Sequence, residues 1–223
     1  MATVADPTVG TNVARVGEVA TGATGALHVV QKPIPSSVGH YRVNHRCILL
    51  ASQAANSRLF EVRNTSATNL LIPTRLIIRW QYSTAHTVAI EDSLDVFKCT
   101  GFTAVDTTNT VTPVPSLKRT SMGATTAAIR GVTVAGAAAG MTGGTLTKDS
   151  SSVGQLPQWM LAAVPTASLV PFTQLDVFDD VNGTSPFIFV QNEGLIIENR
   201  VLLGAAAGST VYIDFSYAEV TAY

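Results

Sequence analysis

The carboxylates best placed to do chemistry in this chain are Asp176, Asp179 and Asp180, in the segment QLDVFDDVNGTSP. Carboxylate oxygens beside a glycine turn can bind calcium, so this segment is the first candidate for a metal site. Its spacing differs from the Asp-x-Asp-x-Asp-Gly calcium loop, and Gln191 stands where a bidentate glutamate would be needed. The pattern instead favours a solvated turn in which Asp and Asn side chains accept hydrogen bonds from nearby backbone amides. We therefore expect no metal.

A pair of carboxylates could also serve as general acid and general base. Glu91 and Asp92 are adjacent, so a regular strand would direct them to opposite faces. This disfavours a mechanism based on that pair, but not one based on carboxylates paired across strands. A hydrolase built on a β-sandwich, using acids such as Asp176 or Glu91, is therefore kept as an alternative function.

Nucleophiles and metal ligands are few. Cys47 and Cys99 lack the spacing of a zinc site or a redox pair and stand beside apolar residues, which predicts two reduced, buried thiols. His40 and His45 are five residues apart, so a strand would direct them to opposite faces. The chain has neither a phosphate-binding Gly-Lys loop nor a Gly-x-Ser-x-Gly elbow. We expect no cofactor and no enzymatic activity.

The composition indicates a protein that assembles with others. The 223 residues are 46% hydrophobic but only 13% charged, about half the roughly 25% that is typical of soluble domains. Ala, Thr, Ser, Gly and Val replace the missing charges. A neutral surface of small side chains loses little rotamer entropy when another protein covers it. Such a surface favours packing against copies or neighbours.

Charge and hydropathy also argue against some partners. The formal net charge is -1 and the 14 Lys and Arg residues are scattered along the chain, so we expect no nucleic acid as the main partner. The densest basic group, Arg42, His45 and Arg46, is expected to form the solvated side of one strand. No apolar run approaches the roughly 20 residues of a membrane span. The N-terminus lacks the features of a secretory signal, so we expect synthesis in a cytoplasm and no membrane partner.

The strongest structural signal lies near the C-terminus. Residues 186–220 predict three strands separated by glycine turns, with their few charges directed outward. Within this segment apolar and polar residues alternate, as in a half-buried antiparallel strand. The predicted core face is Val211, Ile213, Phe215 and Tyr217, and the predicted outer face is Tyr212, Asp214 and Ser216.

A second signal predicts a hairpin over residues 58–82, with the turn residues NTSATN in its middle. Alternation in its second half predicts a core face of Leu76, Ile78, Trp80 and Tyr82. The opposite face is Arg75, Ile77, Arg79 and Gln81. We interpret this second set as a candidate interface, an apolar stripe that another chain could cover with the arginines at its rim. An ordinary solvated strand fits the pattern equally well.

The domain organisation follows from composition. Residues 1–26 are rich in Ala, Thr, Val and Gly without a sustained apolar period, which predicts an extended N-terminal arm. Residues 27–223 are expected to form a single domain. Within it, residues 121–154 consist almost entirely of small residues, which predicts an excursion unable to supply a core. Residues 155–165 fit either a short helix or a strand.

Two segments carry a resemblance to a known family. The sequences VQNEGLIIENRVLLGAAAGSTVYIDFSYAEV and LFEVRNTSATNLLIPTRLIIRW resemble the C-terminal part and an upstream hairpin of structural proteins encoded in the head-gene regions of tailed bacteriophages. The resemblance implies a virion protein, such as a decoration or cement protein that sits on the capsid lattice, often as a trimer. It carries over no catalytic residue.

Pattern and resemblance together predict an all-β fold, an antiparallel β-sandwich of jelly-roll type with an extended N-terminal arm. The expected function is that of a non-enzymatic virion structural protein that forms a homo-oligomer and binds the major capsid protein. The alternative is a receptor- or carbohydrate-binding virion module, which would need exposed aromatic residues at loop tips. Trp159 and Phe102 are the candidates for that role, and both are expected in the core.

Overall fold

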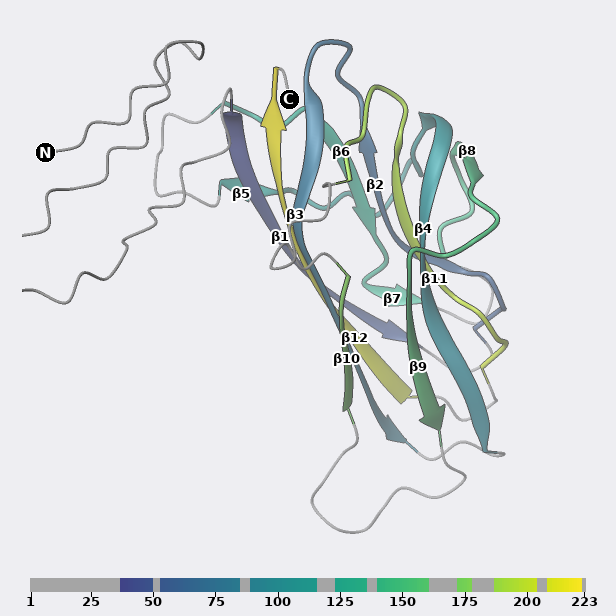
Figure 1. Cartoon of the computed structure of the whole chain (residues 1–223). Coiled ribbons are helices and arrows are strands. Elements are labelled where there is room, and N and C mark those ends of the chain that lie inside the picture. The colour runs from purple at the N-terminus through teal and green to yellow at the C-terminus, as the bar shows by residue number, and fades with distance from the viewer. Residues whose placement is uncertain are drawn as a thin grey trace, which may run out of the picture. The chain divides into compact units, whose positions relative to one another are not determined.

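A computed structural model describes residues 37–49, 53–84, 89–115, 123–135, 140–160, 172–177, 187–203 and 208–221 (Figure 1). The chain divides into a unit Met1–Lys32, which lies outside the described residues, and a unit Pro33–Tyr223, which contains all of them. The predicted arm, residues 1–26, therefore lies outside the described residues. No helix in the ranges given above is long and apolar enough to cross a membrane.

The described residues form an all-β sandwich of two sheets (Figure 1). Sheet 1 has the strand order β10-β3-β12-β1-β5, with β7 beside β1, and sheet 2 has the order β6-β2-β11-β4-β8, with β9 also beside β4. The pairs are antiparallel except for a short parallel contact between β1 and β7. The strands of sheet 1 are β1 Ser37–Leu49, β3 Leu70–Thr84, β5 Val114–Pro115, β7 Val134–Ala135, β10 Phe172–Asp176 and β12 Gly208–Val220. Those of sheet 2 are β2 Arg58–Asn64, β4 Ile90–Ala104, β6 Ala127–Gly131, β8 Thr145–Lys148, β9 Gly154–Met160 and β11 Gly194–Asn199.

The core lies between the two sheets and is supplied by alternate residues of the long strands. Because successive side chains of a strand point to opposite faces, each sheet directs one row of apolar residues inward. The core face predicted for β12 is confirmed. The core positions predicted for Leu76, Ile78 and Trp80 of β3 are also confirmed, and the side chain of Tyr82 lies outside the described part of the structure. Sheet 1 contributes Tyr41, Val43, Cys47, Leu76, Ile78, Trp80, Val211, Ile213, Phe215 and Tyr217, and sheet 2 contributes Phe60, Val62, Leu94, Val96, Leu195 and Ile197.

The prediction of a hairpin over residues 58–82 is wrong. β2 lies in sheet 2, where it pairs with β6 and β11, whereas β3 lies in sheet 1 between β10 and β12. Alternation defines which face of a strand is buried, but not which strand lies beside it. At the corner the Asn64 side chain donates hydrogen bonds to the carbonyls of Asn69 (2.8 Å) and Phe189 (2.9 Å), which leads the chain away from β2.

The chain crosses between the sheets at most of its long connections. It passes from one sheet to the other between β1 and β2, β2 and β3, and β3 and β4, and again between β9 and β10, β10 and β11, and β11 and β12. The remaining long pair, β4 and β9, lies side by side in sheet 2 although residues 105–153 separate the two strands. The strands predicted in residues 186–220 thus also lie in different sheets.

The excursion at residues 121–154 contributes more to the core than its composition predicts. It supplies β6, β7 and β8, and β6 pairs with β2 along its whole length. Ile129, Val132 and Met141 are buried in the main core, so the expectation that this segment cannot supply a core is wrong. Three apolar residues at inward positions are enough for this contribution. Residues 154–160 form a strand, and residues 161–165 lie outside the described residues.

The tight approach of β11 to β2 provides a first test of the fold. A Cβ added at Gly194 would lie 1.9 Å from the carbonyl oxygen of Val62, so backbone would have to move in the centre of sheet 2. Gly194→Ala is expected to lower the free energy of unfolding by about 2–3 kcal/mol in urea denaturation. Gly123→Ala is the control, because a Cβ at Gly123 meets nothing within 4 Å. Equal stability of the two variants would contradict this packing.

Candidate functional site

The outer face of sheet 1 gathers arginines from strands that are far apart in sequence. Arg42 and Arg46 come from β1 and Arg75 and Arg79 from β3, on either side of β12. In the strand register, Tyr212 of β12 lies directly between Arg46 and Arg79. We call this surface the arginine face; it consists of Arg42, Arg46, Arg75, Arg79, Tyr212 and Asp214.

The residues predicted as an interface lie on this face. Arg75, Ile77, Arg79 and Gln81 alternate with core residues of β3 and therefore point away from the core. The structure brings them beside Tyr212 and Asp214 of β12, which the sequence could not place. Ile77 is only 6% exposed, so the accessible part of the predicted stripe is formed by the arginines rather than by its apolar centre.

Asp214 holds two of the arginines. Its carboxylate accepts hydrogen bonds from Nε and Nη2 of Arg42, both at 3.0 Å, and lies 3.5 Å from Nη2 of Arg75. Two parallel bonds from one guanidinium fix its orientation as well as its position. This carboxylate therefore arranges the Arg42 end of the face while it neutralises part of its charge.

Arg46 and Arg79 contact uncharged side chains instead of a carboxylate. The Arg46 guanidinium carbon lies 6.0 Å from the centre of the Tyr212 ring, and Arg79 Nε donates a 2.8 Å hydrogen bond to Gln174 Oε1. A hollow of about 300 Å³ opens beside Arg46, Arg79 and Tyr212. A guanidinium group that has further N–H donors can bind a carboxylate of another molecule through two parallel hydrogen bonds, as Arg42 binds Asp214.

His45 does not belong to this basic group, contrary to expectation. Its ring points inward, where Nε2 lies 2.9 Å from the Val132 carbonyl oxygen and the ring centre lies 5.9 Å from that of Phe60. The reason is alternation, since His45 is an odd number of residues from both Arg42 and Arg46. Burial lowers the pKa of His45, although the hydrogen bond to Val132 partly opposes this.

Part of the outer face of sheet 2 is covered by a second layer of chain, which includes Val105, Asp106, Gly143 and Leu146. Beneath that layer lies a separate apolar cluster of Phe97, Cys99, Phe102 and Ile196. Phe102 is thus buried as predicted. Cys99 is buried here while Cys47 is buried in the main core, which agrees with two thiols acting as small hydrophobes.

A buried carboxylate fastens this second layer to the sheet. Glu61 Oε1 accepts a 2.6 Å hydrogen bond from the Asp106 backbone amide, and Oε2 lies 3.0 Å from Arg58 Nη1. Arg58 in turn donates to the carbonyls of Met141 (Nε, 3.1 Å) and Gly143. Burial raises the pKa of Glu61, against the hydrogen bond from Asp106 and the charge of Arg58. These partners replace water around the buried carboxylate.

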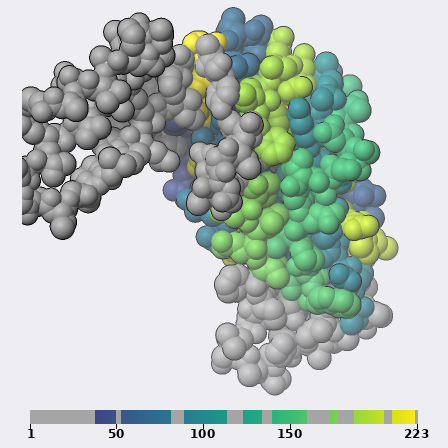
Figure 2. Space-filling model, viewed as in Figure 1, coloured from purple at the N-terminus to yellow at the C-terminus, as the bar shows by residue number. Residues whose placement is uncertain are grey.

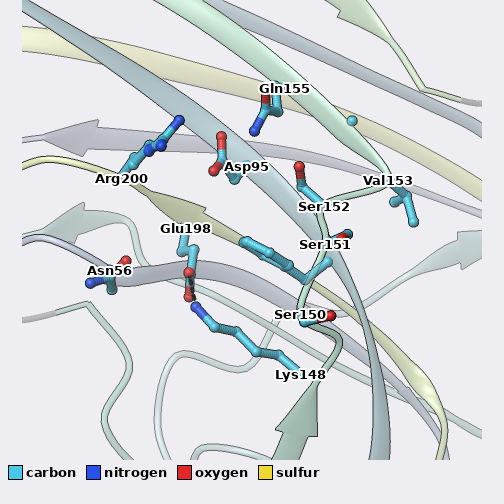
Figure 3. A pocket seen from close by; sticks show the side chains of 12 residues that line it. Asn56, Asp95, Lys148, Ser150, Ser151, Ser152, Val153, Gln155, Glu198 and Arg200 are labelled. Atoms are coloured by element: carbon cyan, nitrogen blue, oxygen red, sulfur yellow. Dashed lines mark hydrogen bonds and ion pairs between the residues drawn. The ribbon is translucent and has the colours of Figure 1, made fainter.

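Next to this layer the outer face of sheet 2 contains a hollow of about 600 Å³ (Figure 3). We call it the polar hollow. Its floor carries Asp95 of β4 and Glu198 of β11, which are direct cross-strand neighbours. Ser93 Oγ donates a 2.6 Å hydrogen bond to Asp95 Oδ1. The lining residues are Asn56, Asp95, Phe97, Lys148, Ser150, Ser151, Ser152, Val153, Gly154, Gln155, Glu198 and Arg200.

Cations and carboxylates are balanced in the polar hollow. Lys148 forms an ion pair with Glu198, and its ammonium lies 4.5 Å from the centre of the Phe97 ring. In Figure 3 the side chains of Asp95, Arg200 and Gln155 point into the same space, and the Lys148–Glu198 pair lies apart from them. The arrangement offers hydrogen-bond donors and acceptors side by side.

Other predicted site residues are not brought together. Glu91 lies on the outer face of sheet 2, opposite Trp159, whereas Asp176 lies on the outer face of sheet 1, opposite Ile77. Asp179 and Asp180 lie outside the described residues. Within the described parts of the chain, no group of three or more His, Cys, Asp and Glu side chains is placed to hold a metal ion.

Sequence reasoning missed Asp95 and Glu198, and it misplaced Trp159. Both carboxylates stand at outward positions of alternating strands, which is a readable signal, but only the register between β4 and β11 shows that they are neighbours. Trp159 was expected in the core and is 61% exposed. It occupies an outward position of β9, whereas its neighbour Gln158 is buried and accepts a 2.9 Å hydrogen bond from Thr173 Oγ1.

No protein-family model, curated protein or solved structure matches this chain. The two outer faces offer contrasting chemistry. The arginine face is an open surface with an excess of cations, and the polar hollow is a concave surface whose lining carries two carboxylates and two cations. Figure 2 shows the segment that contains β8 and β9, coloured green, at the surface on the side seen in Figure 1.

Asp92 fixes the rim of the polar hollow. Its side chain is buried, and Oδ1 accepts hydrogen bonds from the backbone amides of Ser93 (2.7 Å), Arg200 (3.1 Å) and Val201 (2.8 Å). Oδ2 is buried without a hydrogen-bond partner among the described residues. Burial raises the pKa of Asp92 to about 6, although the three backbone hydrogen bonds lower it.

This raised pKa predicts a pH dependence of stability. The folded state binds a proton more tightly than the unfolded state, so the contribution of Asp92 is fully present below the unfolded pKa near 3.8 and is lost as pH rises through about 6. Relative to Asp92→Asn, the wild type should gain about 1–3 kcal/mol of unfolding free energy as pH falls from about 7 to 4. Urea denaturation across this range measures the difference. A constant difference would contradict the assignment, and Asp149→Asn, at an exposed site, is the control.

Proposed function

We propose that the protein is a non-enzymatic structural component of a virion, a capsid decoration or cement protein that binds the major capsid protein. The observation that carries this proposal is the arginine face, an open surface on which four guanidinium groups surround Tyr212 and Asp214. The partner surface would present carboxylates. The resemblance to head-region proteins of tailed bacteriophages supports the same proposal, which includes synthesis in the host cytoplasm and incorporation into the virion.

The proposed fold is a jelly roll. Its support is the strand order, in which β1, β12, β3 and β10 lie in one sheet and β2, β11, β4 and β9 lie in the other. An eight-stranded jelly roll formed by two Greek keys has this arrangement, and it recurs in viral capsid proteins. Residues 105–153, which connect β4 to β9, are then an insertion between two neighbouring strands of one sheet.

The arginine face has the composition of an interface centre. Tyr and Arg are the side chains most often found at interface hot spots, and here a tyrosine ring lies between two arginines. Asp214 already holds Arg42, so less side-chain entropy is lost when a partner binds. On a capsid lattice, moderate affinity per contact is sufficient, because a molecule with several contact sites makes its later contacts intramolecularly.

A charge-neutralising double variant tests the proposal. Arg46→Gln with Arg79→Gln should weaken binding to capsids assembled without this protein by at least tenfold, since a close charge pair contributes roughly 1.5 kcal/mol or more. Co-sedimentation at several salt concentrations measures the affinity, and salt should reduce wild-type binding. The control, Lys98→Gln with Arg200→Gln, removes the same charge from the sheet 2 side of the molecule. Loss of binding in the control alone would overturn the assignment to the arginine face.

The proposal includes a homotrimer, which rests on the resemblance. Light scattering coupled to size exclusion should give three times the mass of one 23.4 kDa chain. The Arg46→Gln, Arg79→Gln variant should keep this mass, because the arginine face is assigned to the capsid and not to the trimer. A wild type that remains monomeric at high concentration would contradict the trimer, and a monomeric double variant would reassign the face to self-association.

A further inference from the structure

We propose that the outer face of sheet 2 carries a binding site for an uncharged oligosaccharide, formed by the polar hollow and Trp159. This inference goes beyond the proposed capsid role and depends on the opposite face of the sandwich, so each can fail without the other. It rests on the charge balance of the hollow, on the rigidity of its floor, and on a continuous row of residues that leads from it to Trp159.

The charge balance defines the class of ligand. Two carboxylates, Asp95 and Glu198, are matched by two cations, Lys148 and Arg200. A charged ligand would find each attractive group beside a repulsive one, whereas a sugar hydroxyl both donates and accepts hydrogen bonds and can use either kind. Amide and hydroxyl groups of Gln155 and of Ser150, Ser151 and Ser152 add further donors and acceptors.

The floor of the hollow is preorganised. Asp95 and Glu198 stand on neighbouring strands, and both are at least nine-tenths buried within the chain. Ser93 orients Asp95, Lys148 orients Glu198, and Asp92 fixes the backbone of Arg200 at the rim. Polar groups held on strands can orient a ligand without losing much entropy of their own.

A row of outward residues connects the hollow to Trp159. Along β9, Gln155, Pro157 and Trp159 are exposed, and they lie opposite Asp95, Ser93 and Glu91 of β4. Gln155 lines the hollow, and Trp159 lies four residues further along the strand, roughly 13 Å away at about 3.3 Å per residue.

Trp159 supplies what the hollow lacks. An exposed indole offers a flat apolar surface and one N–H donor, which suit the C–H face and the hydroxyls of a sugar ring. Because of its distance from the hollow, a linear oligosaccharide can contact both parts, whereas a monosaccharide can contact only one. We therefore expect affinity to increase with chain length.

The two tryptophans of the chain allow a direct test. Trp80 is 0% exposed and Trp159 is 61% exposed, so acrylamide quenching of the intrinsic fluorescence reports on Trp159. The probes are maltotetraose, cellotetraose and chitotetraose, their monosaccharides, and sialyllactose as a charged comparison, each up to about 1 mM. At least one neutral tetrasaccharide should protect Trp159 saturably, and its monosaccharide should bind at least tenfold more weakly.

Variants separate the site from the rest of the molecule. Trp159→Ala should abolish binding of the tetrasaccharide measured by calorimetry, and Gln155→Ala should weaken it about tenfold, as for loss of one hydrogen bond to a polar ligand. Both positions are exposed, so folding should be retained and is checked by circular dichroism. Tyr212→Ala, an exposed aromatic on the arginine face, is the control and should bind normally.

Three results would overturn the inference. The first is that no neutral probe, and no glycan in a wider neutral array, protects Trp159 from quenching. The second is that only charged glycans bind. The third is that the Trp159→Ala variant still binds the tetrasaccharide. Capsid binding is measured in parallel with the same variants. Trp159→Ala should leave it unchanged, which distinguishes failure of this inference from failure of the capsid proposal.

Discussion

The ion pair between Arg58 and the fully buried Glu61, which lies against the segment around Asp106, is the interaction on which the difference between the two outer faces depends. Removing one member of a buried ion pair strongly destabilises a protein, because the charge of the remaining member is left uncompensated. Here each member also binds backbone of the covering layer, through Asp106 on one side and through Met141 and Gly143 on the other. The pair therefore holds the second layer on sheet 2. On sheet 1, the arginines of β1 and β3 stay accessible at the surface.

This division gives the sandwich two surfaces of different use. The arginine face is wide, open and cationic, which suits a protein partner that arrives with carboxylates. The polar hollow is concave and carries equal numbers of carboxylates and cations, which suits a neutral ligand with many hydroxyls. A virion protein that binds the lattice with one face would present the other to its surroundings, so the two proposals are compatible in one molecule.

Local alternation explains which parts of the structure could be predicted from the sequence. Residues 75–80 and 211–217 reveal their buried faces because a strand has a period of two residues, and the core confirms both. Strand partners could not be predicted, because the switch from sheet 2 to sheet 1 after β2 depends on side-chain hydrogen bonds of Asn64 to distant carbonyls. Because strand partners could not be predicted, the proximity of Asp95 and Glu198 could not be predicted either; the register between β4 and β11 places them side by side. Trp159 was misplaced because hydrophobicity was taken to imply burial, whereas its position in β9 points outward.

The position of β12 has a consequence for how the chain acquires its structure. This strand lies between β1 and β3, and it forms most of the hydrogen bonds of both. Sheet 1 therefore cannot close until the ribosome has synthesised residue 220, and until then the early strands have exposed, unpaired edges. Contacts between residues so distant in sequence slow folding, and open edges favour aggregation of the nascent chain. The order of the strands therefore predicts slow folding and a greater tendency to aggregate during high-level synthesis.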